Sequence, residues 1–196
     1  MKYTVTLFLM TTSLVSFACI SNNFTKLCAS SDITYSIPEG FRPVEIKQNP
    51  DLAYHYAVKH KNKKLEIRYS IFPLKEDAEA YNEYVKNRSK KRIILIDPNK
   101  DHELSAITAA MNISRSKIKE GFHTFNPDAV KLDCNADWGA SYYIENNSIY
   151  GKGYKYSLVV ALHKKNRANA FIVYLFDTEE DVGNEIAASF CNLKFK

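Results

Sequence analysis

The stretch Leu65-Glu66-Ile67-Arg68-Tyr69-Ser70-Ile71-Phe72 alternates large apolar or aromatic side chains with mostly polar ones. Successive side chains of a β-strand point to opposite faces, so a period of two predicts a strand with one face in the core. Residues 52–59 alternate in the same way, and the lysine-rich residues 59–64 join the two stretches. Together they predict an antiparallel β-hairpin.

The last third of the chain carries further strand patterns. Residues 137–145 and 154–163 alternate, and an apolar stretch at 170–177 follows a polar turn. Shorter strands are expected at 33–38 and 192–195. Strands joined as hairpins form an antiparallel sheet.

Three helices are expected, at residues 75–87, 102–119 and 179–190. Their apolar stripes follow helical spacing: Ala78, Tyr81 and Val85; Leu104, Ile107, Met111 and Ile118; Val182, Ile186 and Phe190. Each helix must bury its stripe on another layer. The sequence therefore predicts an α+β fold in which helices cover a central antiparallel sheet, in one domain spanning residues 33–196.

Residues 1–18 have the pattern of an export signal. Lys2 supplies the positive start, an apolar run follows, and Ala18 is the small residue at the cleavage point. The run is too short, and too rich in Thr and Ser, to span a bilayer. We therefore expect the chain to act outside the cytoplasm.

Cys19 follows this segment directly and predicts a lipid anchor. The segment resembles a bacterial lipoprotein signal, although Ser16 stands where Leu is usual. Lipidation of Cys19 would hold the protein on a membrane of the cell envelope, with residues 19–32 as a polar tether. The alternative is ordinary cleavage after Ala18 or Ala29, which would give a secreted protein.

The net charge of +5 comes from three basic runs, at residues 59–64, 86–92 and 164–167. We expect no nucleic acid as a partner, because an exported protein rarely meets one. The runs are interpreted as a solvated helix end and two hairpin tips. Attraction to an anionic membrane surface is the alternative.

Cys134 and Cys191 lie next to predicted strands, and an exported compartment permits disulfides. They are the favoured pair. Two buried thiols, or a pairing that involves Cys28, are the alternatives. No Cys-x-x-Cys motif or Cys/His ligand spacing occurs, so no metal or cofactor is expected.

The order of elements resembles that of the Mog1/PsbP-like superfamily. The similar stretches are Tyr35-Ser36-Ile37-Pro38-Glu39-Gly40-Phe41, the hairpin at 53–72 and the segment 154–195. The resemblance implies a central antiparallel sheet sandwiched by helices in an α/β/α arrangement. It also implies a binding or structural role rather than catalysis, and it carries over no site residue.

No nucleophile elbow, zinc-protease motif or phosphate loop occurs in the sequence, so we expect a binding protein and not an enzyme. Trp138 is the only tryptophan, and such residues anchor interfaces. The expected binding surface combines it with polar neighbours and the hairpin tips: Asp137, Lys63, Lys64, Lys164 and Lys165. Burial of Trp138 in the core is the alternative.

Two functions follow from these patterns. The first is a non-enzymatic, exported envelope protein that binds a protein partner or supports an assembly. The alternative is a periplasmic domain that binds or hydrolyses a small ligand.

Overall fold

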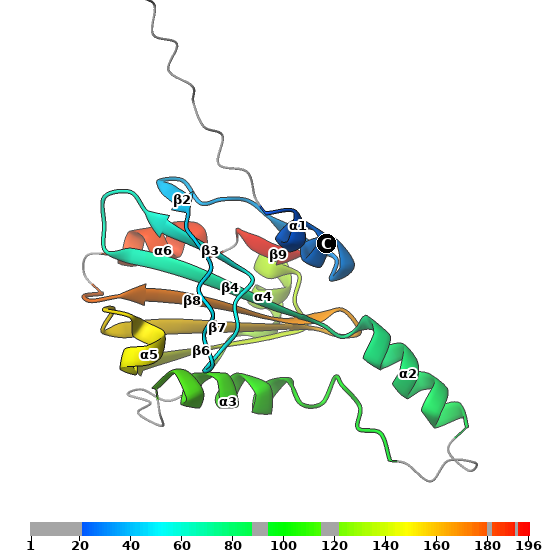
Figure 1. Ribbon diagram of the computed structural model, residues 1–196. Helices are drawn as coiled ribbons and strands as arrows, with labels where there is room; N and C mark the ends of the chain where they lie inside the picture. Colours follow the sequence, from blue (N-terminus) through cyan, green and yellow to red (C-terminus); the bar gives the residue numbers. More distant parts are fainter. Residues whose placement is uncertain (1–20, 88–93, 115–121, 180–181, 191) are drawn as a thin grey trace, which may run out of the picture.

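A seven-stranded antiparallel sheet forms the centre of the protein, with helices on both sides (Figure 1). The computed structural model describes residues 21–87, 94–114, 122–179, 182–190 and 192–196. The predicted fold class is confirmed within these residues. In spatial order the strands are β2 (Phe41–Pro43), β3 (Tyr56–His60), β4 (Leu65–Pro73), β8 (Ala168–Phe176), β7 (Tyr156–Lys164), β6 (Trp138–Glu145) and β5 (His123–Thr124).

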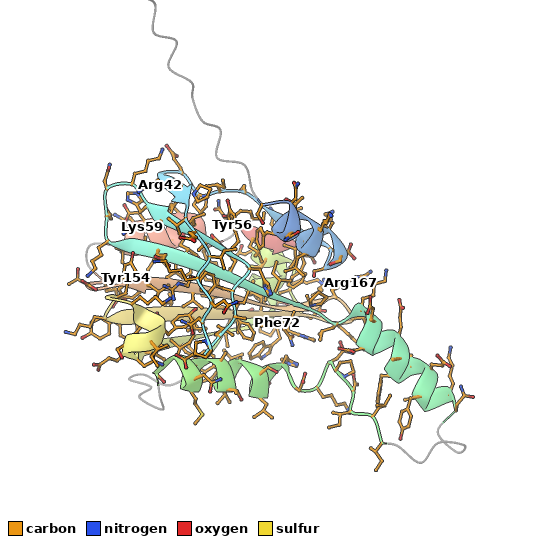
Figure 2. The ribbon with its side chains drawn as sticks, viewed as in Figure 1. Arg42, Tyr56, Lys59, Phe72, Tyr154 and Arg167 are labelled. Carbon is orange, nitrogen blue, oxygen red and sulfur yellow. The ribbon has the colours of Figure 1, made fainter. Side chains whose placement is uncertain are left out.

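The long central strands follow the alternation in the sequence. Strand β4 pairs with β8 over its full nine residues, from Leu65 opposite Phe176 to Pro73 opposite Ala168. The β3–β4 and β7–β8 turns therefore lie at opposite ends of the sheet. Figure 2 shows Lys59 toward one end and Arg167 toward the other.

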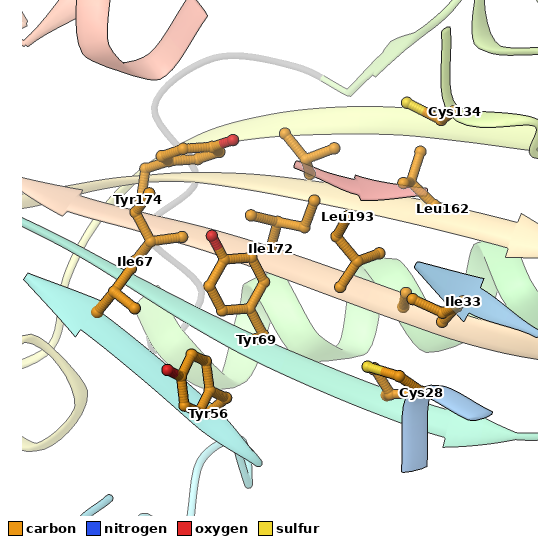
Figure 3. Close-up of a cluster of buried hydrophobic side chains, with 14 of the residues drawn as sticks. Cys28, Ile33, Tyr56, Ile67, Tyr69, Cys134, Leu162, Ile172, Tyr174 and Leu193 are labelled. Atoms are coloured by element: carbon orange, nitrogen blue, oxygen red, sulfur yellow. The ribbon is translucent and has the colours of Figure 1, made fainter. Parts of the chain in front are cut away.

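The first face of the sheet is covered by α1 (Asn22–Ser30), α4 (Pro127–Cys134), α6 (Gly183–Ser189) and a small sheet of β1 (Ile33–Tyr35) and β9 (Leu193–Phe195). Figure 3 shows part of this core, which contains Cys28 and Ile33 as well as the Tyr56 and Tyr69 rings of β3 and β4. The predicted stripe of the last helix is confirmed here, since Val182 and Ile186 are buried and Phe190 packs against the same core.

Residues 19–32 were expected to form a polar tether, but residues 22–30 form helix α1. Ser21 caps the helix by accepting a hydrogen bond from the Phe24 N–H at 3.2 Å. The Phe24 ring stacks on Tyr56 at 4.7 Å, and Cys28 is buried in the same core. Residues 22–30 therefore belong to the folded domain, because a short helix is stabilised mainly by packing its apolar side chains on another layer.

The second face is covered by α3 (His102–Ser114) and α5 (Ser148–Gly151). Helix α3 does not bury the predicted stripe: Leu104, Ile107 and Met111 are 67%, 37% and 42% exposed. The side that packs is small, with Ala106, Ala109, Ala110 and Ile113 against the sheet. Alanines allow the helix to approach a floor already filled by aromatic rings. Ile118 lies outside the described residues.

Helix α2 (Lys75–Lys86) leaves the end of β4 and projects from the body (Figure 1). Ala78 is buried as predicted and Tyr81 is half-buried, but Val85 is 51% exposed and Tyr84 is buried instead. The strand expected from residue 52 begins only at Tyr56. In the ranges that the structure describes, no helix is long and apolar enough to cross a membrane.

Candidate binding site

A groove of about 620 Å³ lies between α3, the start of α2 and the end of the sheet; we call it the α3 groove. Its apolar floor comes from Leu52 in the loop before β3, Phe72 on β4 and Phe171 on β8. The Phe72 and Phe171 rings meet edge to face at 5.7 Å. Figure 2 shows Phe72 on the side of the sheet that α3 covers.

The rim of the α3 groove is polar and acidic. Asp77 comes from the first turn of α2, and Asp101 immediately precedes α3. Along α3, Ser105 and Thr108 face the groove, and Leu104 extends the apolar surface into solvent. An apolar floor with two carboxylates suits a ligand that combines apolar and cationic groups.

The groove is long enough for a peptide segment. It follows α3 from Asp101 to Asn112, which at the helical rise corresponds to about 16 Å. That length matches about five residues of an extended strand or three turns of a helix.

A cluster of aromatic and imidazole rings lies next to the groove, behind its lining residues Asp101 and Asn169. The His102 and His163 rings stack at 4.2 Å, and Trp138 meets His102 edge to face at 4.9 Å. His163 Nδ1 lies 2.7 Å from Oδ1 of Asn169, which also lines the groove. Burial lowers the pKa of His163, so the neutral imidazole is favoured there.

Trp138 is therefore half-buried against this cluster rather than the anchor of an open surface. The predicted alternative, packing in the core, is closer to the structure. Its contact with His102, which follows the lining residue Asp101, makes its fluorescence a reporter of changes next to the groove.

Asp137, next to Trp138, contacts three lysines near the β7–β8 turn. Its Oδ1 lies 3.1 Å from Lys131 Nζ and 3.5 Å from Lys164 Nζ, and its Oδ2 accepts the Lys165 backbone N–H at 2.9 Å. Burial opposes ionisation, but the Lys165 N–H and the two ammonium groups hold the pKa of Asp137 below its usual range.

Lys63 and Lys64 lie at the other end of the sheet. Lys63 Nζ is 2.6 Å from Glu185, and Lys64 Nζ is 2.6 Å from Asp177. The length of β4 separates the two turns by about 27 Å. The expected binding surface is therefore corrected: Asp137, Trp138, Lys164 and Lys165 come together, and Lys63 and Lys64 are remote from them.

Cys19 and Cys191 lie outside the described residues. Cys28 and Cys134 are both buried in the core of the first face. Burial raises the pKa of the Cys28 thiol to about 11. The Cys134–Cys191 disulfide stays a prediction. Among the described residues, no group of three or more His, Cys, Asp or Glu side chains is placed to hold a metal ion.

No model of a known protein family matches the chain, and no curated protein matches its sequence.

Proposed function

We propose that the protein is a non-catalytic, exported envelope protein, anchored through a lipid on Cys19, that binds a protein partner in the α3 groove. The observation that carries the proposal is the groove itself, which joins an apolar floor to the exposed side chain of Leu104. The Mog1/PsbP-like resemblance points to the same class of role. The partner would present a segment of apolar side chains interspersed with Lys or Arg.

The positions of α1 and α3 on the two faces of the sheet favour a groove that points away from the membrane. Helix α1 follows the proposed anchor and lies on the first face, whereas α3 lies on the second (Figure 1). A lipid attached ahead of α1 would leave the α3 groove directed away from the membrane. A partner in the surrounding compartment would then reach it without competition from lipid.

Selection of binding peptides tests the groove directly. A library of peptides of about twelve residues, the length of three helical turns, is displayed on phage and selected on the purified domain. We expect enrichment of sequences that combine apolar residues with Lys or Arg. Their affinity should fall at least about tenfold in Leu104→Glu, since a carboxylate would enter the apolar contact.

The chain offers a matched control for this variant. Leu132 on α4 is 86% exposed and belongs to the opposite face, so Leu132→Glu makes the same chemical change away from the groove. Asp101→Lys should weaken the basic peptides as well. Equal binding to all three variants, or selection of peptides without this composition, would contradict the proposal.

The anchor is tested separately in a bacterial host fed a labelled fatty acid. The full chain should take up label and stay with the membrane fraction, and Cys19→Ser should lose both properties. Label retained by Cys19→Ser would show that the anchor lies elsewhere. Release of an unlabelled full chain would favour simple secretion.

A further inference from the structure

Arg68 lies almost fully buried near the middle of β4, four residues before Phe72 of the α3 groove. It is 2% exposed and occupies β4 on the second face, beside α5. Burying a guanidinium without partners is strongly unfavourable. Its contacts must therefore compensate its charge, and they also fix its position.

Each contact constrains the guanidinium in a different direction. Nε donates to Glu66 Oε1 at 2.7 Å, and Nη1 donates to the Tyr150 carbonyl at 2.6 Å. The Tyr54 and Tyr150 rings lie on the group, with centroids 5.0 Å and 4.8 Å from Cζ. A cation packed against two aromatic rings is stabilised by both of them.

Within the described residues, the hydrogen bonds of Arg68 to Glu66 and to the Tyr150 carbonyl come from Nε and Nη1. Arg68 lines a cavity of about 330 Å³, which we call the Arg68 pocket. A guanidinium that is held in place by its neighbours and lines a concave site is a preorganised partner for an oxygen anion. The volume is at the lower end of small-molecule sites.

The other charges around the Arg68 pocket reinforce this preference. Four cationic side chains line it, and only two carboxylates oppose them: Lys47, Lys59, Lys152 and Arg68 against Glu45 and Glu66. Glu66 is engaged by Arg68, so the lysines supply the surplus positive charge. A dianion balances that surplus better than a monoanion, which favours phosphate over carboxylate.

The backbone conformation of Lys152, one of these lysines, is unfavourable for a residue with a side chain. It is the C-cap that follows α5, and its φ of 45° lies in the left-handed region where glycine is favoured. A lysine there costs about 1 kcal/mol relative to glycine. The backbone alone therefore does not explain a lysine at this position, and its ammonium group contributes to the pocket instead.

We propose that the Arg68 pocket binds a phosphate group, with the Arg68 guanidinium, Lys59 and Lys152 as its donors. This site is distinct from the α3 groove and does not depend on the function proposed for it. The phosphate could belong to a soluble phosphomonoester or to a lipid headgroup, since both present the same oxygens.

Binding of inorganic phosphate at millimolar concentration, followed by calorimetry and by thermal protection of the purified domain, tests the site. Lys152→Gly should weaken binding by about tenfold or more, the usual effect of losing one charge-assisted contact. The same variant should be at least as stable as the original chain, because glycine suits the left-handed backbone. Lost binding without lost stability separates the site from a folding defect.

Lys59→Gln should also weaken phosphate binding, and Lys165→Gln provides a control with the same change in net charge at the other end of the sheet. Glycerol 3-phosphate and vesicles of phosphatidic acid in phosphatidylcholine distinguish a soluble ligand from a headgroup. Phosphate affinity equal in all three variants, or absence of binding to the original chain, would overturn the proposal. Acetate binding as tightly as phosphate would overturn the preference for a dianion.

Discussion

Replacing Arg68 by methionine should be among the most destabilising single changes in the protein. The side chain of Glu66 is only 14% exposed and hydrogen-bonds the guanidinium. Arg68→Met keeps the apolar volume between the Tyr54 and Tyr150 rings but leaves the carboxylate and the Tyr150 carbonyl without their donors. Removing one partner of a buried pair costs about 3–5 kcal/mol.

Urea unfolding followed by Trp138 fluorescence measures this loss. With a denaturant slope of about 2 kcal/mol/M, typical for a small domain, the midpoint should fall by about 2 M. The double variant Glu66→Gln/Arg68→Met should recover at least about 1 kcal/mol of the loss, because residue 66 then no longer carries an unpaired buried charge. A loss below about 1 kcal/mol for Arg68→Met, or no recovery in the double variant, would refute this account of the pair.

Three further changes test packing and titration with the same unfolding assay. Gly139→Ala should cost about 1–3 kcal/mol, because a Cβ would lie 2.9 Å from a side-chain carbon of Phe125 and from one of Val130. Gly183→Ala meets nothing within 4 Å and should be neutral or stabilising, so equal effects would contradict this account. Phe24→Ala should lower the free energy of unfolding by about 3–5 kcal/mol, because it removes a ring buried against Tyr56. A negligible cost would show that α1 does not contribute to the stability of the fold. Burial lowers the pKa of His163 in the folded state, so the unfolded chain binds more protons below about pH 6.5 and stability should fall as the pH drops below that value. His163→Gln should flatten this part of the profile, and an unchanged slope would show that other groups cause it.

The strands were predictable because alternation is a local property. Residues 65–72 carry it without interruption, and β4 follows almost the same range. Residues 52–59 carry it too, but β3 begins at Tyr56. The preceding residues leave the sheet: Leu52 enters the floor of the α3 groove, and the Tyr54 hydroxyl accepts the Lys47 backbone N–H. Alternation alone cannot say where a partner strand ends.

Helix α3 shows why the larger apolar stripe is not always the buried one. Its sequence contains two stripes with helical spacing, and the prediction chose the one with Leu104, Ile107 and Met111. The smaller stripe of alanines and Ile113 packs instead. The sheet beneath presents Tyr142 and Phe171, so the space left for a helix is shallow. The choice depends on the residues of another element, which periodicity within α3 does not contain.

Neither candidate site could be predicted from spacing. The α3 groove combines residues near positions 52, 72, 101–112 and 170, which only the topology of the sheet brings together. Arg68 had the pattern of a solvent-facing strand residue. Helix α5 and the loop before β3 cover that face, and the charge is buried because Glu66 and Tyr150 compensate it.

The two sites should bind independently although they share one strand. Arg68 and Phe72 are four residues apart on β4, which corresponds to about 13 Å. Neither set of lining residues includes a member of the other. Saturating phosphate should therefore change the affinity of a groove-binding peptide by no more than about twofold, after ionic strength is matched with chloride. Lys152→Gly separates two effects of phosphate on the peptide. The variant weakens phosphate binding in the Arg68 pocket, whereas phosphate in solution screens a basic peptide as it does with the original chain. Peptide affinity that falls in proportion to phosphate in the original chain, and not in Lys152→Gly, would show that one ligand occupies both sites.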